Sequence, residues 1–308
     1  MKFLVIFLLL FTFSSAHTIE ISSSNASSDY EKLTYKIVED KAKELSRFLE
    51  LSDLTLKVSL FDDPDKFYQL TGLPEHIPGA LLSTQNIIYL KTPDVTMMDR
   101  MQFQNLIVHE MLHAIQNQII SLVLFPDWFN EGFAEFFSGS FGVNSKIRLS
   151  KLLLTKYQPD LSQLTHIDHC FSQPASDKYI LSASAIEFLQ INFGESIFNT
   201  LFQDMHQTKN FQKSLENVTH LTFDQFNFYW QQYLNKRYDK LFLMDLNYII
   251  WLFLPFLFIF SFIVKQILNQ SILNKWKYER IEEEINQIFT NFSVDDPRSE
   301  GTGSVPRS

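Results

Sequence analysis

The sequence predicts an α+β domain followed by one membrane-spanning helix near the carboxyl end. Residues 54–61 carry leucine or valine at every second position, which is the period of a half-buried strand. From Met101 to residue 238 the apolar side chains recur at helical spacing. Residues 246–264 hold no charge over 19 positions, close to the ~20 residues that a bilayer-crossing helix needs. A small sheet followed by a helical half is an α+β arrangement.

The individual elements follow from the same two periods. A first helix is predicted at 30–49, where apolar residues stand close to helical spacing. The strand at 54–61 stops at Asp62-Asp63-Pro64, and a second strand is predicted at 87–90. The helices of the second half are predicted at 101–120, 127–139, 144–156, 178–193, 195–207, 209–217 and 223–238.

Both ends of the chain carry targeting signals. Residues 1–16 combine one lysine, an apolar run too short to cross a bilayer and the small residues Ser14-Ser15-Ala16, so we expect an export signal cleaved after Ala16. Basic residues flank the span at 241–264 on both sides and do not decide its orientation. The export signal decides the orientation, because it places residues 17–240 outside the cytoplasm and the polar tail 265–308 inside.

Composition excludes some classes of function. The net charge is −9 with a pI near 5.4, so the basic surface that nucleic-acid binding needs is missing. One cysteine, Cys170, excludes an intramolecular disulfide and a zinc site made of cysteines alone. His166, His169 and Cys170 lie close together but have no helical frame, so we do not predict a second metal site there.

The strongest chemical signal is His109-Glu110-Met111-Leu112-His113. Its apolar flanks predict a helix, which places the two histidines one turn apart on the same face. Two imidazoles can then bind one metal, and Zn²⁺ suits nitrogen and carboxylate ligands in a tetrahedral site with one open position. Glu110 can face water in that position and accept its proton.

A second helix supplies carboxylates. It begins after Pro126-Asp127 and carries Glu131 and Glu135 among aromatic neighbours, where two unpaired carboxylates would be costly. Seventeen residues separate Glu131 from His113, enough for a turn and a returning helix, so we predict Glu131 as the third metal ligand. Glu135, one turn later, could accept a hydrogen bond from the other nitrogen of a ligand imidazole.

These two blocks resemble the gluzincin metallopeptidases, most closely the peptidase MA-like families with H-E-x-x-H followed by W-x-x-E-G-x-A-E-[FY]. Both blocks match at residues 109–113 and 128–136. Weaker similarity at 179–194 and 223–234 extends the resemblance over roughly residues 55–238. The resemblance implies a thermolysin-like fold, with the active-site helix under a small sheet and a helical lobe beyond the cleft.

The implied reaction is peptide-bond hydrolysis by zinc-activated water, with Glu110 as general base. Tyr179 is the candidate oxyanion donor, because gluzincins often place a tyrosine downstream of the third ligand; packing of this tyrosine in its helix explains it equally well. A sheet edge within 79–90 could bind an extended substrate by strand addition.

The cleavage mode is indicated by a missing residue. In the aminopeptidase branch, a glutamate binds the free amine of the substrate. This glutamate has no counterpart at 79–83, which favours an endopeptidase.

Two other functions stay open. The domain could be an inactive, metal-stabilised module that holds peptides in the same cleft, or a membrane-associated assembly or chaperone factor. The intact Glu110 favours the enzyme, because metal binding alone does not need it. The expected partners are a peptide or protein substrate and the lipid bilayer through residues 241–264.

Overall fold

The computed structural model describes residues 16–24, 28–155, 159–164 and 175–294. The chain divides into two compact units, residues 1–242 and residues 243–308. Residues 1–15, and with them most of the predicted export signal, lie outside the described residues. The α+β prediction is confirmed for the first unit, which has a small mixed sheet followed by a helical lobe.

The sheet has four strands in the order β1-β2-β4-β3. β1 and β4 both run parallel to β2, and β3 pairs antiparallel with β4 at the edge. The strands are β1 (Ala16–Ser24), β2 (Asp53–Phe61), β3 (Gly79–Leu82) and β4 (Ile87–Lys91). The two predicted strands correspond to β2 and β4. β1 was not predicted, because Ile19 and Ile21 are the only apolar side chains that it packs against the core.

Helices make up the rest of this unit. The helices that surround the sheet are α1 (Ser28–Phe48), α2 (Pro64–Thr71), α3 (Pro93–Thr96) and α4 (Arg100–Ile119). The helical lobe contains α5 (Asp127–Phe137), α6 (Val143–Leu154), α7 (Ala175–Phe193), α8 (Ile197–Thr208), α9 (Phe211–Thr219) and α10 (Phe223–Tyr238). The seven predicted helices of this half match α4 to α10 within a few residues. α2 and α3 were not predicted; each is short, and Phe67 is the one buried residue of α2.

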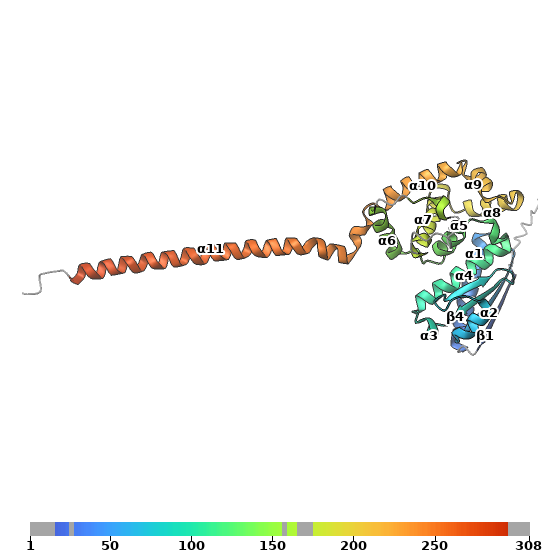
Figure 1. Cartoon of the computed structure of the whole chain (residues 1–308), viewed down its shortest axis with the longest axis horizontal. Helices are drawn as coiled ribbons and strands as arrows, with labels where there is room; N and C mark the ends of the chain where they lie inside the picture. Colours follow the sequence, from blue (N-terminus) through green and yellow to red (C-terminus); the bar gives the residue numbers. More distant parts are fainter. Residues whose placement is uncertain (1–15, 25–27, 156–158, 165–174, 295–308) are drawn as a thin grey trace, which may run out of the picture. The chain divides into compact units, whose positions relative to one another are not determined.

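α4 connects the two halves of the domain. It packs against α1, β2, β3 and β4 on one side and against α5 on the other. Figure 1 shows α2, α3 and the strands gathered at one end of the unit and α6 to α10 at the other. A helix in this position is buried over most of its length, and ten of its residues from Phe103 to Gln116 are buried. Residues 109–113 therefore lie at the junction of the sheet and the lobe.

The helical lobe is held by phenylalanine contacts. Phe129 and Phe133 of α5 contact Phe202 of α8, and Phe137 contacts Phe198. Each ring pair adds about 0.5–1.5 kcal/mol beyond the burial of its area. These phenylalanines therefore serve the packing of the lobe.

α7 packs closely against α5 at Gly132. A Cβ atom added at this glycine would lie 2.4 Å from the backbone oxygen of Ser182, a distance that real Cβ atoms do not adopt. The glycine of the motif therefore lets α7 approach α5 directly beside Glu131.

A buried ion pair joins three helices of the lobe. The carboxylate of Glu187 on α7 accepts hydrogen bonds from Lys146 Nζ at 2.7 Å, from the Tyr233 hydroxyl at 2.7 Å and from the Tyr238 hydroxyl. Burial works against its charge, but these donors hold the pKa of Glu187 below its ordinary value of 4.5. The cluster connects α7 with α6 and with α10, the last helix before the second unit.

We expect Glu187→Ala to lower the free energy of unfolding by about 3 kcal/mol, because three donors lose their charged acceptor. A group with a lowered folded-state pKa stabilises above its unfolded pKa and loses that contribution as the pH falls through the folded pKa. As the pH is lowered from about 4.5, the free energy of unfolding of wild type should therefore decrease more steeply than that of the variant. Denaturant unfolding from pH 7 to pH 3 measures both effects. Glu44→Ala, at an exposed position of α1, is the control and should change little.

The second unit is dominated by one helix, α11 (Leu246–Val294), with Pro255 inside it. It follows a short 3₁₀ turn at Leu241–Met244. Among the described residues, α11 is the helix long and apolar enough to cross a membrane. The predicted apolar span is confirmed at this level, but the helix starts at Leu246 rather than at 241 and continues thirty residues beyond Val264.

Candidate metal centre

The two histidines of the motif come from the middle of α4. Asp99 caps this helix, accepting from the backbone N–H of Gln102 while the Gln102 side chain accepts from the backbone N–H of Asp99. This capping box fixes where the helix begins. His109 and His113 lie one turn apart, with their Nε2 atoms 3.2 Å from each other. The sequence-based placement of the pair is reproduced.

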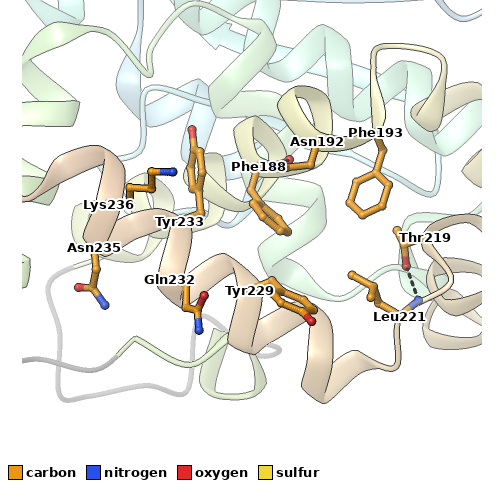
Figure 2. A pocket seen from close by; sticks show the side chains of 10 residues that line it. All are labelled: Phe188, Asn192, Phe193, Thr219, Leu221, Tyr229, Gln232, Tyr233, Asn235 and Lys236. Carbon is orange, nitrogen blue, oxygen red and sulfur yellow. Dashed lines mark hydrogen bonds between the residues drawn. The ribbon is translucent and has the colours of Figure 1, made fainter.

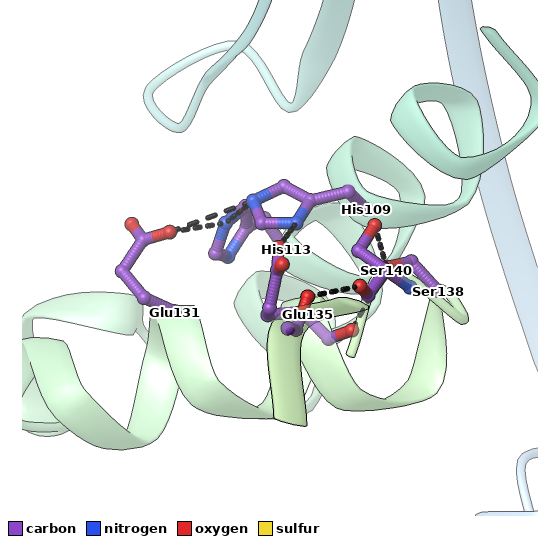
Figure 3. Close-up of polar contacts among 7 residues, drawn as sticks. His109, His113, Glu131, Glu135, Ser138 and Ser140 are labelled. Atoms are coloured by element: carbon purple, nitrogen blue, oxygen red, sulfur yellow. Dashed lines mark hydrogen bonds and ion pairs between the residues drawn. The ribbon is translucent and has the colours of Figure 1, made fainter. Parts of the chain in front are cut away.

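Glu131 reaches the same point from α5. Its Oε2 lies 3.5 Å from Nε2 of His109 and 3.6 Å from Nε2 of His113. Figure 3 shows the carboxylate facing both rings across the gap between the two helices. Ligands about 2.05 Å from a tetrahedral Zn²⁺ lie about 3.3 Å from one another. The three distances of 3.2, 3.5 and 3.6 Å are close to that spacing, so the donor set fits a zinc ion.

Glu135 lies one turn beyond Glu131 on α5 and faces the far side of the first imidazole. Its Oε2 is 3.7 Å from Nδ1 of His109, the ring nitrogen that points away from Glu131. The turn that follows α5 is fixed by Ser138, whose hydroxyl donates to the carbonyl of Glu135 at 3.1 Å and contacts the Ser140 hydroxyl (Figure 3). A carboxylate in this position can select the tautomer that leaves Nε2 free for a metal.

Glu110 is buried beside the histidines and is hydrogen-bonded to the sheet. Its carboxylate accepts a hydrogen bond from the backbone N–H of Leu81 on the edge strand β3. Burial raises the pKa of Glu110, while His109 and His113 oppose the rise. A buried carboxylate beside a group that can bind a metal is well placed to accept and donate a proton.

The electrostatics of the centre favour a bound cation. Burial opposes protonation of His109, but the hydrogen bond to Glu131 and the nearby carboxylates outweigh it and raise the pKa of His109 to about 9. Burial likewise opposes the charge of Glu131, but His113 and His109 lower the pKa of this carboxyl far below its ordinary range. The pKa of Glu135 is raised, chiefly by burial. Three glutamates around two imidazoles thus form a site for positive charge.

A cleft of about 740 Å³ reaches the centre at His109. Its lining includes His109, Glu110 and Glu135, and two chain segments form its walls. One wall consists of Ile77, Pro78 and Gly79 before and within β3, and the other of residues from Gly139 to Ser145 after α5. Tyr179 of α7 also lines this cleft. Tyr179, predicted as an oxyanion donor, therefore lies in the same cleft as Glu110.

A second hollow, of about 790 Å³, lies between α7 and α10 (Figure 2). Its walls are aromatic, from Phe188, Phe193 and Tyr229, with amide side chains and Lys236 beside them. No carboxylate or imidazole is among its lining residues. Although this hollow is slightly larger, the groups that can bind a metal or transfer a proton belong to the other cleft.

Two contributors to the site were not predicted as such. The Leu81 N–H was not identified, because a backbone donor leaves no pattern of residue types; the predicted sheet edge at 79–90 was its only signal. Gly132 was noted only as one position of the W-x-x-E-G-x-A-E motif. In the structure, its lack of a side chain allows α7 to approach α5 closely. Residues 166–170, the weak histidine and cysteine cluster, lie outside the described residues.

No family model matches the chain, and no curated protein matches its sequence. The resemblance to gluzincins therefore depends on the sequence motifs alone.

Proposed function

We propose that the chain is a membrane-anchored zinc peptidase of the gluzincin type. The observation that supports this best is the set of three ligand-atom distances, each within a few tenths of an ångström of the spacing around tetrahedral zinc. His109, His113 and Glu131 would hold the ion. When bound, zinc would lower the pKa of a water molecule and polarise the substrate carbonyl.

The chain's own residues supply the proton transfer. Glu110 would take the proton of the attacking water and deliver it to the leaving amine. The hydrogen bond from the Leu81 N–H fixes one side of this carboxylate, and burial raises its pKa above the ordinary value. Glu135 would hold the ring of His109 in place. Tyr179, in the same cleft, is the candidate hydroxyl donor to the oxyanion.

The substrate would be an extended peptide. β3 is the edge strand of the described sheet, and its Leu81 contacts Glu110, so a peptide added along this edge would pass the proton acceptor. The cleft is open at its rim, where Met101 and Val143 are exposed. An open cleft and the absence of an amine-binding glutamate at 79–83 favour internal cleavage of a chain over removal of its first residue.

The proposal includes the fold and the location. A sheet edge over the active-site helix and a helical lobe beyond it suit a thermolysin-like domain. Export by residues 1–16 and a span formed by α11 would place the peptidase domain outside the cytoplasm, in a periplasm, a lumen or the extracellular space. Residues 265–308 would lie in the cytoplasm.

A metal-stabilised binding or assembly module is the alternative, and Glu110 distinguishes the two. A module that only holds peptides gains nothing from a buried carboxylate beside the metal ligands, and burying that charge costs stability. An enzyme needs this group in this place.

Chelation tests the proposed activity. The full chain, purified in detergent, is incubated with an unstructured protein, and fragments are separated by mass spectrometry. Cleavage should stop with 1,10-phenanthroline and return with added Zn²⁺. Cleavage that persists under chelation, or no cleavage by protein that contains one zinc per chain, would reject a zinc peptidase.

Loss of the Glu135 carboxylate should weaken zinc binding without abolishing it. Glu135→Gln removes the acceptor beside Nδ1 of His109, and we expect zinc affinity to fall about 10- to 100-fold. Competition against a chromophoric chelator measures the affinity. Glu44→Gln, on the exposed face of α1, is the matched control. Equal affinity of Glu135→Gln and wild type would show that Glu135 does not orient the ring.

A further inference from the structure

The tail part of α11 carries a narrow apolar stripe. In residues 277–288 the apolar side chains are Tyr278, Ile281, Ile285 and Ile288, which we name the tail seam. Every other residue of this stretch is polar or charged. The three isoleucines are 43%, 46% and 55% exposed in the single chain. A stripe of large aliphatic side chains on an otherwise charged helix needs a covering surface.

The spacing of the tail seam is that of a coiled coil. Its members follow one another after three, four and three residues, which are the a and d positions of a heptad. This pattern keeps all four side chains on one face of the helix, and that face is narrower than the stripe of a helix packed on a globular core. The helix is continuous from the apolar span through the seam.

We propose that the tail seam joins copies of this chain in a parallel coiled coil. Copies anchored by the same helix in one bilayer enter it in the same direction, so their tails run parallel. In a parallel pair, Lys277 occupies position g and meets position e of the next heptad on the neighbouring chain. That position is Glu282, so this contact between helices places opposite charges together.

A membrane surface is a poor alternative cover for the seam. Helices that lie on a bilayer are rich in lysine and arginine on their polar face. Here Lys277 and Arg280 are outnumbered by the four glutamates at 279, 282, 283 and 284, so anionic lipids would repel this stretch. The neighbouring copy, with Lys277 opposite Glu282, is the partner whose charge fits.

The core residues also indicate the number of chains. Isoleucine at both a and d positions favours three strands over two. One heptad nearer the span, both core positions are polar, with Ser271 at a and Asn274 at d, and polar core residues fix the register at a cost in stability. The seam is short, and helices below ~12–15 residues are marginal on their own. Anchoring in one bilayer raises the effective concentration of the tails and offsets this weakness.

Disulfide crosslinking of the full chain in phosphatidylcholine vesicles tests the proposal. Cys170→Ser removes the native thiol, and one cysteine is added either in the seam, Ile281→Cys, or on the opposite face, Glu283→Cys. After copper–phenanthroline oxidation we expect covalent dimers from the seam position at about tenfold the rate of the outer position, because only a and d residues face one another. Equal rates, or no crosslinking at position 281, would overturn the proposal.

A charge reversal tests the parallel register. Lys277→Glu, in the Ile281→Cys background, places glutamates opposite each other and should reduce crosslinking several-fold. Adding Glu282→Lys to Lys277→Glu restores opposite charges and should restore the crosslinking rate. Failure of either the loss or the rescue would overturn the arrangement. These outcomes do not depend on the metal centre, because zinc content and peptide cleavage are not measured.

Discussion

Glu110→Gln is expected to reduce peptide cleavage by about 10³-fold, within the range for loss of a general base. Glutamine has nearly the same shape as glutamate and can still accept the hydrogen bond from the Leu81 N–H. It cannot accept the proton of the attacking water. Zinc content should stay at the wild-type level, because Glu110 is not among the three proposed ligands.

The readout is the initial rate of fragment formation, with the zinc content of the same samples. The melting temperature provides the folding control: replacing a buried carboxylate by a neutral amide should leave it unchanged or raise it. A variant that binds zinc, melts normally and cleaves as fast as wild type would support the binding module instead.

Gly132→Ala should destabilise the domain by about 3 kcal/mol, at the upper end for an overpacked core site. In an ordinary helix this change would be favourable by about 1 kcal/mol. Here the new methyl group would lie 2.4 Å from the backbone oxygen of Ser182 and 2.6 Å from its carbonyl carbon, so α5 and α7 must separate. The shift would also displace Glu131, the neighbouring residue, and lower zinc affinity.

Gly142→Ala is the matched control for this variant. No atom lies within 4 Å of an added Cβ at Gly142, and its φ of −86° suits any residue. Chemical denaturation should find Gly142→Ala within about 0.5 kcal/mol of wild type. If Gly132→Ala were as stable as Gly142→Ala, the close contact between α5 and α7 would be wrong.

Periodicity predicted most of the domain because most of its elements bury one regular face. The alternation at 54–61 and the helical spacing after Met101 come directly from that burial, and β2 and α4 to α10 were found. β1 was missed because its sequence is mainly serine, threonine and glutamate and its position depends on pairing with β2. Such pairing is a long-range property that the local sequence does not encode.

The site was predictable where helix geometry determines it. One turn of helix places His109 and His113 on one face, and the next helix carries Glu131 and Glu135 at the same spacing. The distance between α4 and α5 was not predictable, because it depends on long-range packing, in which α5 is itself positioned by its close contact with α7 at Gly132. The hydrogen bond from Leu81 to Glu110 likewise depends on where the sheet edge meets α4.

The zinc content of the purified chain tests the central claim most directly. Wild type, His113→Ala and Glu131→Ala are dialysed against one buffer with trace Zn²⁺, and metal is measured by mass spectrometry against protein concentration. We expect one zinc per wild-type chain and a large loss in both variants, since each removes one of three ligands. Wild-type protein without zinc, or variants that keep it, would contradict a metal centre formed by His109, His113 and Glu131.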